Sequence, residues 1–209
     1  MKKSIVLLCL GFLSLVSCQK EVANSPIPSY TSIKEQPKSK EFKKIVWREE
    51  KTDEDGLVKN SIAIDSSFFK TINDRDKACL GYVVTFVGNE CWWDGDQTTD
   101  SRDNLKCVLL DALQLGYQCS DTHLGFLRKW FESDARVSKE LEDCPTIPYT
   151  STIQNTFREI EFYAEDTFVY IRTKESEVEM RNDYYEEYEK HYEFELKNEQ
   201  LYLTRVTKK

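Results

Sequence analysis

The sequence predicts an α+β fold made of an N-terminal β-hairpin, a disulfide-stapled helical block and a C-terminal antiparallel β-meander. Three observations lead to this prediction. Two β-like segments flank Asp55-Gly56, a dipeptide that is a strong hairpin-turn signal. The middle of the chain combines helical apolar spacing with five cysteines. Beyond Pro148, apolar and charged residues alternate with the period of two that is typical of half-buried strands.

The hairpin prediction covers residues 42–51 and 57–64, which contain many β-branched and aromatic side chains. Asp65 and the two serines after it can cap a helix, because a side-chain oxygen at a helix start accepts hydrogen bonds from its first amides. This first helix carries three apolar residues, Phe68, Phe69 and Ile72.

Two longer helices are expected next. One covers 74–88, although its residues 82–87 are β-branched and aromatic and also fit a strand. The other covers 102–115 and has a continuous apolar face. Gly116 suits the left-handed residue that commonly follows the end of a helix.

A fourth helix completes a helical block that spans about residues 65–133. Ser120 or Asp121 can cap it, and its apolar residues recur at helical spacing. These residues are Leu124, Leu127, Trp130 and Phe131.

The C-terminal part, about residues 157–206, is expected to form the meander. Four segments have the composition of strands, namely 157–164, 167–173, 192–196 and 200–206. Asn198-Glu199 fits a tight turn between the last two. Residues 175–191 fit either a helix or a long charged hairpin, and we favour strands there.

The charge balance restricts the classes of partner. The 209 residues include 29 Lys and Arg against 37 Asp and Glu, a formal net charge of −8. Binding of nucleic acid needs clustered basic side chains against the phosphates, so a nucleic-acid partner is not expected. The length suits one domain, which we place at 42–209, and leaves the oligomeric state open.

The N-terminus has the three parts of an export signal. Met1-Lys2-Lys3 is positively charged, residues 5–16 are mostly apolar, and Leu15-Val16-Ser17-Cys18 follows. The last four residues resemble the lipobox of bacterial lipoproteins. That resemblance implies that residues 1–17 are a signal peptide and that Cys18 carries fatty acyl chains such as palmitate. The alternative is an ordinary signal peptide with an incidental cysteine.

The resemblance also implies a location in the cell envelope. Residues 18–41 contain three prolines and no apolar period, which predicts a lipidated flexible tether that leads from the membrane to the domain. No aspartate follows Cys18, which by resemblance to lipoprotein sorting signals favours the outer membrane. Lys20-Glu21 faintly resembles a surface-export signal, so the periplasmic and the surface face both stay open.

Export would place the remaining cysteines in an oxidising compartment, where disulfides form. The candidates are Cys79, Cys91, Cys107, Cys119 and Cys144. Cys79 to Cys91 and Cys107 to Cys119 share the spacing C-x8-G-x2-C, so we expect the nested bridges Cys79–Cys119 and Cys91–Cys107. Each would contribute about 2–4 kcal/mol. Cys144 is then the odd cysteine, with an exchanged partner as an alternative.

The loop 91–103 carries oxygen ligands at alternate positions, as calcium loops do. The residues concerned are Asp94, Asp96 and Asp100. The loop departs from the EF-hand pattern, since its glycine comes early and no glutamate stands at position twelve. We therefore favour a solvated capping loop, and expect no cofactor and no calcium.

The sequence contains no recognisable catalytic motif around its two histidines, His123 and His191. We therefore name no catalytic residue and expect a non-catalytic binding protein with a protein partner, for instance an inhibitor or an immunity-type factor. The aromatic binding candidates are Trp92, Trp93, Tyr184, Tyr185 and Tyr188. The alternative is a glycan-binding module or hydrolase that uses the loop Trp92-Trp93-Asp94. Burial of Trp92, Trp93 and His123 would argue against it.

Overall fold

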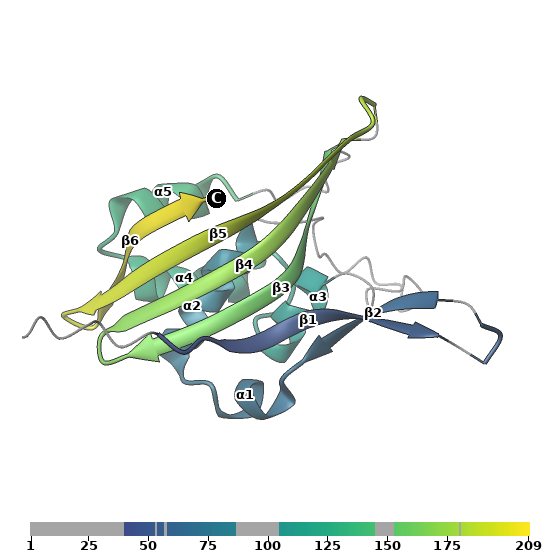
Figure 1. Ribbon diagram of the computed structural model, residues 1–209. Coiled ribbons are helices and arrows are strands. Elements are labelled where there is room, and N and C mark those ends of the chain that lie inside the picture. Colours follow the sequence, from purple (N-terminus) through teal and green to yellow (C-terminus); the bar gives the residue numbers. More distant parts are fainter. Residues whose placement is uncertain (1–39, 53, 57, 87–104, 145–152, 180) are drawn as a thin grey trace, which may run out of the picture. The chain divides into compact units, whose positions relative to one another are not determined.

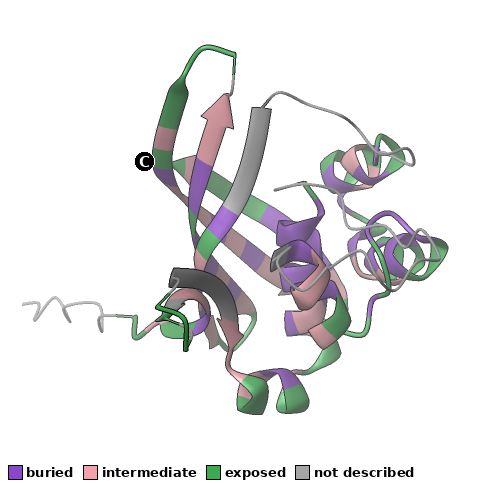
Figure 2. Cartoon of the chain, turned by 90° about the vertical axis from the view of Figure 1, so that its right-hand side faces the viewer, coloured by how far each residue is buried: buried purple, intermediate pink, exposed green. Residues whose placement is uncertain are grey.

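The fold is an antiparallel six-stranded sheet with helices on one face (Figures 1 and 2). The computed structural model describes residues 40–52, 54–56, 58–86, 105–144, 153–179 and 181–209. All of them belong to the unit Ser39–Lys209. The strand order is β2-β1-β3-β4-β5-β6. The predicted α+β class, with its N-terminal hairpin and C-terminal meander, is confirmed.

The N-terminal hairpin consists of β1 (Lys43–Thr52) and β2 (Val58–Ile64). The two strands pair in antiparallel register from Val46 opposite Ile64 to Thr52 opposite Val58. β1 also pairs with β3, so the hairpin extends the sheet that the C-terminal strands build. The sequence predicts the hairpin, but nothing in it indicates this second pairing.

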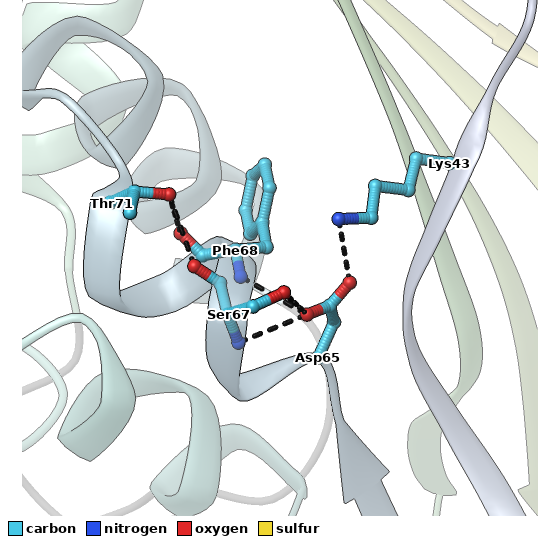
Figure 3. Close-up of polar contacts among 5 residues, drawn as sticks. All are labelled: Lys43, Asp65, Ser67, Phe68 and Thr71. Carbon is cyan, nitrogen blue, oxygen red and sulfur yellow. Dashed lines mark hydrogen bonds and ion pairs between the residues drawn. The ribbon is translucent and has the colours of Figure 1, made fainter.

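Asp65 begins α1 (Ser66–Thr71) and joins it to the hairpin (Figure 3). Its Oδ1 accepts hydrogen bonds from the backbone amides of Ser67 and Phe68, both at 3.0 Å. Its Oδ2 lies 2.7 Å from Nζ of Lys43 in β1. The hydrogen bonds from Lys43, Ser67 and Phe68 hold the pKa of Asp65 well below its ordinary value. The predicted cap is confirmed.

The next two helices are α2 (Asp74–Thr85) and α3 (Leu105–Ala112). The strand alternative for 82–87 is wrong for 82–85, which are helical and buried. Gly116 is left-handed as expected (φ 75°), but the left-handed residue that closes α3 is Gln114 (φ 53°), two residues earlier. The amides of Gln114 and Leu115 then bond back to the carbonyls of Asp111 and Leu110, a Schellman closure.

α4 (Asp121–Phe131) and α5 (Ala135–Glu142) form a helical hairpin. Ser120 caps α4 as expected, whereas α5 is not predicted from the sequence. The hairpin returns the chain so that Cys119, before α4, and Cys144, after α5, lie 5.9 Å apart between Cα atoms and form a disulfide.

The expected disulfide pairing is therefore wrong in two respects. Cys144 is bridged rather than odd, and among the described residues the free cysteine is Cys79, which is fully buried in α2. Cys107 is also disulfide-bonded. Cys91, its expected partner, lies outside the described residues.

The C-terminal meander consists of β3 (Ile153–Glu165), β4 (Phe168–Glu179), β5 (Tyr184–Lys197) and β6 (Gln200–Lys208). The preference for strands over 175–191 is confirmed, since β4 and β5 pair from Phe168 opposite Glu195 to Glu179 opposite Tyr184. Asn198 and Glu199 turn between β5 and β6 with φ of 51° and 63°.

The core lies between the helices and the sheet. Phe131 of α4 is fully buried, with ring centroids 5.6 Å from Tyr82 of α2 and 6.0 Å from Phe194 of β5. α2 and α4 approach closely at Gly81, where a Cβ atom would stand 2.8 Å from Leu115 and 3.2 Å from Leu127. The helices therefore cover one face of the sheet tightly.

Candidate functional site: the open face of the sheet

The face of the sheet opposite the helices is the candidate site, and we name it the open face. Side chains alternate between the two faces along each strand. On β4, Val169 and Ile171 are buried under the helices, whereas Phe168, Tyr170 and Arg172 point to the open face and stay partly exposed. Among the residues that the structure describes, every helix lies on the other side (Figure 2).

Charged side chains of opposite sign face each other across the strands in the middle of this face. Glu159 of β3 lies between Lys44 of β1, which contacts its Oε2, and Lys174 of β4, whose Nζ is 3.0 Å from Oε1. Partial burial raises the pKa of Glu159, but the hydrogen bonds from the two lysines outweigh it and lower the pKa. The same bond raises the pKa of Lys174. Both groups are therefore charged at neutral pH.

Four aromatic rings form a row beside these charges, and we name it the aromatic row. Its members are Phe42, Tyr163, Tyr170 and Phe168. Neighbouring ring centroids are 5.8, 5.9 and 6.1 Å apart, which is within the usual range for aromatic pairs.

Two cationic side chains contact rings of the aromatic row. Nζ of Lys40 lies 3.1 Å from the ring centroid of Tyr170, and the guanidinium carbon of Arg172 lies 3.6 Å from that of Phe42. Both distances are within cation–π range. Flat rings with adjacent positive groups suit apolar contact combined with recognition of carboxylates.

Two hollows deepen the open face. One, of about 660 Å³, is lined by Trp47, Lys44, Arg158 and other charged side chains of β1, β3, β4 and β5. The other, of about 240 Å³, lies at the aromatic row and reaches Arg205 on β6. The Nε1 of Trp47 donates a hydrogen bond to Glu49 at 2.7 Å, so the indole is held in place at the first hollow.

The three predicted tyrosine anchors do not form one surface. Tyr185 is 55 % exposed and lies on the open face, where its hydroxyl accepts a hydrogen bond from Arg158 at 2.6 Å. Tyr184 is 42 % exposed, but strand alternation places it on the opposite face. Tyr188 shares that opposite face and is buried, with Nζ of Lys208 3.8 Å from its ring centroid. The role of the three tyrosines in binding stays a prediction, and Tyr185 is the one that lies on the candidate site.

His123 is fully buried inside the helical block. Its Nδ1 accepts a hydrogen bond from the Cys119 amide at 3.1 Å, so Nε2 carries the proton and faces the Gly81 carbonyl oxygen at 3.4 Å. Burial, together with the nearby charge of Lys106, lowers the pKa of His123 to about 4, although the hydrogen bond to the Gly81 carbonyl acts in the opposite direction. The ring is thus a neutral structural link between α2 and α4.

Lys106 is 2 % exposed and belongs to the same polar cluster. Its Nζ donates to the Thr85 carbonyl oxygen at 3.1 Å and to Gln118 at 3.0 Å, and Gln118 donates to the same carbonyl at 2.7 Å. These bonds close the C-terminal end of α2 against the residues before α4.

Several predicted site residues lie outside the described residues. They are Cys18, Cys91, Trp92, Trp93, Asp94, Asp96 and Asp100. The lipid site, the calcium loop and the glycan loop therefore stay predictions. Within the described ranges, no cluster of three or more His, Cys, Asp or Glu side chains suits a metal ion. No helix in those ranges is long and apolar enough to cross a membrane.

The aromatic row was not predicted from the sequence. One signal was present, because Phe168, Tyr170 and Arg172 alternate with buried residues along β4. Sequence alone does not show that Tyr163 and Phe42 lie next to them, since β1 joins β3 only in the folded sheet. The predicted tyrosines of β5 are not among the rings of the aromatic row, which Phe42, β3 and β4 supply.

Comparisons of the chain with models of known protein families, with curated proteins and with solved structures find no match.

Proposed function

We propose that the protein is a non-catalytic binding protein that recognises a protein partner through the open face of its sheet. The observation that carries the proposal is the aromatic row, which has partly exposed rings and lies next to fixed charges. Aromatic side chains and arginine supply most of the binding energy at many protein interfaces.

The geometry of the face supports binding in a second way. The strands hold the rings and charges on a rigid sheet, so little side-chain freedom is lost when a partner docks. The ion pairs of Glu159 with Lys44 and Lys174 fix the positions of charges beside the rings. Fixed charges give specificity and register to an interface.

The buried histidine also favours binding over catalysis. General acid–base catalysis needs a proton-transfer group that reaches substrate and titrates near the working pH. His123 is sealed under the helices, with both ring nitrogens directed at groups of the block.

An envelope location through a lipid on Cys18 is part of the proposal. The variant Cys18→Ala should abolish lipid attachment and release the protein from membranes or leave it uncut. Mass spectrometry of the wild-type protein from its native membrane decides the point. A chain without acyl groups, in which residues 1–17 are retained, would contradict the anchor.

The binding role is tested by quantitative capture from native envelope extracts with the full chain. Tyr170→Ala should weaken capture of the partner by at least about tenfold, because a central aromatic anchor is worth 1.4 kcal/mol or more. Tyr117→Ala is the matched control, since Tyr117 is 46 % exposed in the helical block, away from the open face. Equal capture by both variants would contradict the proposal.

A further inference from the structure

β6 is an edge strand of the sheet and has β5 as its only neighbour in the described strand order (Figure 1). The amide and carbonyl of Lys209 exchange hydrogen bonds with those of Glu189. Hydrogen-bonded and non-hydrogen-bonded pairs alternate along an antiparallel ladder. Val206, opposite Tyr192, and Lys208, opposite Lys190, are therefore non-hydrogen-bonded pairs, and their own amides and carbonyls point away from the sheet.

The first half of this edge is closed by side chains. The Leu203 amide donates to Oδ2 of Asp134 at 2.9 Å, and the Arg136 guanidinium donates to the Leu203 carbonyl oxygen. Gln200 is bonded to Lys129 and Ser133 at the end of α4. In the parts of the chain that the structure describes, no comparable group covers the edge at Val206–Lys208. An uncovered edge can pair with another strand.

A partly apolar hollow adjoins the uncovered half. It measures about 380 Å³, and its apolar wall consists of Tyr82 and Val83 of α2, Phe86 at the C-cap of α2, and Leu203 and Val206 of β6. Its charged lining consists of Arg136, Glu140 and Lys190. Phe86 is 44 % exposed and Val206 is 43 % exposed, both unusual for large apolar side chains. An added strand would place every second side chain over this hollow.

The charged side chains of the edge strand itself are basic, although the chain as a whole has a net charge of −8 and β5 places Glu193 opposite Arg205 and Glu189 opposite Lys209. Arg205 and Lys209 lie on the open face of the edge, and Lys208 lies on the hollow side. Lys208 pairs with Glu186 at 3.0 Å. Arg205 is exposed and has no ion pair within the described ranges. Two copies joined edge to edge would bring these like charges together, which disfavours self-association.

We propose that Val206–Lys208 accepts an extended segment of an acidic partner protein as a seventh strand. The segment would bond to the outward amides and carbonyls, set its acidic side chains against Arg205 and Lys209, and set its apolar side chains into the hollow. Strand addition of this kind draws affinity from the main chain and specificity from alternate side chains. The inference rests on the proposed function and names the chemistry of the partner.

The test uses the full chain and two synthetic peptides of equal length, one alternating glutamate with valine and one alternating lysine with valine. The first should slow hydrogen exchange of the Val206 and Lys208 amides by at least about tenfold, as new hydrogen bonds form there. The lysine peptide should not. Equal protection by both peptides, or binding without protection at these amides, would overturn the inference.

Charge-reversal variants make the test specific. Arg205→Glu should weaken the affinity for the glutamate peptide by at least about tenfold. Arg128→Glu is the matched control, since it reverses an exposed charge on α4. Phe86→Ala should also weaken binding, and exchange measurements on the free variants verify that each is folded. Concentration-dependent protection of the edge without peptide would mean that a second copy occupies it, against the inference.

Partner capture separates this inference from the proposed function. If Tyr170→Ala reduces capture and Arg205→Glu does not, the edge inference fails and the open-face proposal stands. If neither variant reduces capture, both fail. If both reduce it, the open face and the edge belong to one binding surface.

Discussion

The helical block and the open face of the sheet differ in what their polar groups do. Inside the block, His123 and Lys106 each bond to backbone carbonyls or amides, so their positions are fixed by the fold. On the open face, Glu159 bonds to the side chains of Lys44 and Lys174. The first arrangement fixes helices against each other, whereas the second keeps charged side chains at the surface of the sheet.

In the function that we propose, strand alternation separates the residues that stabilise the fold from those that recognise the partner. The buried residues of β4 can be optimised for packing without changing Tyr170 and Arg172, which point the other way. Substitutions on one face should therefore affect folding, and substitutions on the other should affect binding.

The largest effect is expected from a matched pair of phenylalanines. Phe131→Ala should lower the free energy of unfolding by about 3–5 kcal/mol, because it leaves a cavity between Tyr82 and Phe194. Phe168→Ala, on the open face, should cost less than about 1.5 kcal/mol, the scale of one stacked pair. Urea denaturation of both variants measures this, and equal losses would show that the open face is part of the core.

The second effect concerns pH. Burial lowers the pKa of His123 from 6.5 to about 4, so the unfolded chain binds more protons than the folded chain between these values. The neutral ring therefore makes its full contribution to the free energy of unfolding above pH 6.5. About 3 kcal/mol of that free energy is lost as the pH falls to about 4.

Unfolding measured across pH 7 to 4 checks this prediction. The Asn side-chain oxygen in His123→Asn can accept the hydrogen bond from the Cys119 amide. This variant should be less stable than wild type at pH 7 but should lose less stability on acidification. The contribution of the Asp65 cap is lost only below its ordinary pKa of 3.8, so it leaves this window nearly unaffected. An unchanged slope in the variant would refute the assignment.

A pair of glycines gives the third prediction. Gly81→Ala should destabilise the protein by about 1–3 kcal/mol, because its Cβ would press on the buried Leu115 and Leu127. Gly125→Ala in α4 meets no atom within 4 Å and should stabilise by up to about 1 kcal/mol. Thermal unfolding distinguishes the two, and effects of the same sign would contradict the close approach of α2 and α4.

The smallest effect on stability is expected at the charges of the open face. Lys174→Ala removes one of two cations from Glu159 and should cost less than about 1 kcal/mol, since Lys174 is half exposed and screened by water. Added salt should shrink the difference from wild type. A large loss that persists at high salt would mean that this ion pair supports the fold.

Local signals explain what was predictable from the sequence. Some signals determine the structure of only the few residues around them. These are the Asp55-Gly56 turn, the Asp65 and Ser120 caps and the alternation in β5. Short-range physics decides these elements, so the hairpin, α1, α4 and the meander could be predicted.

The rest depends on contacts between distant residues. α5 is short, and the disulfide Cys119–Cys144 depends on the hairpin that α4 and α5 form. The repeated cysteine spacing predicts other partners. It carries no information about the α4–α5 hairpin, which brings Cys119 and Cys144 together. The aromatic row likewise needs three strands to meet, which no local pattern specifies.

The most direct test of the central claim is a footprint of the protein in complex with its captured partner. Labelling of exposed tyrosines with and without partner compares Tyr163 and Tyr170 of the aromatic row with Tyr117 of the helical block. We predict that the partner protects Tyr163 and Tyr170 and leaves Tyr117 unchanged. Protection of Tyr117 with unchanged labelling of the aromatic row would contradict the assignment of the open face as the binding surface.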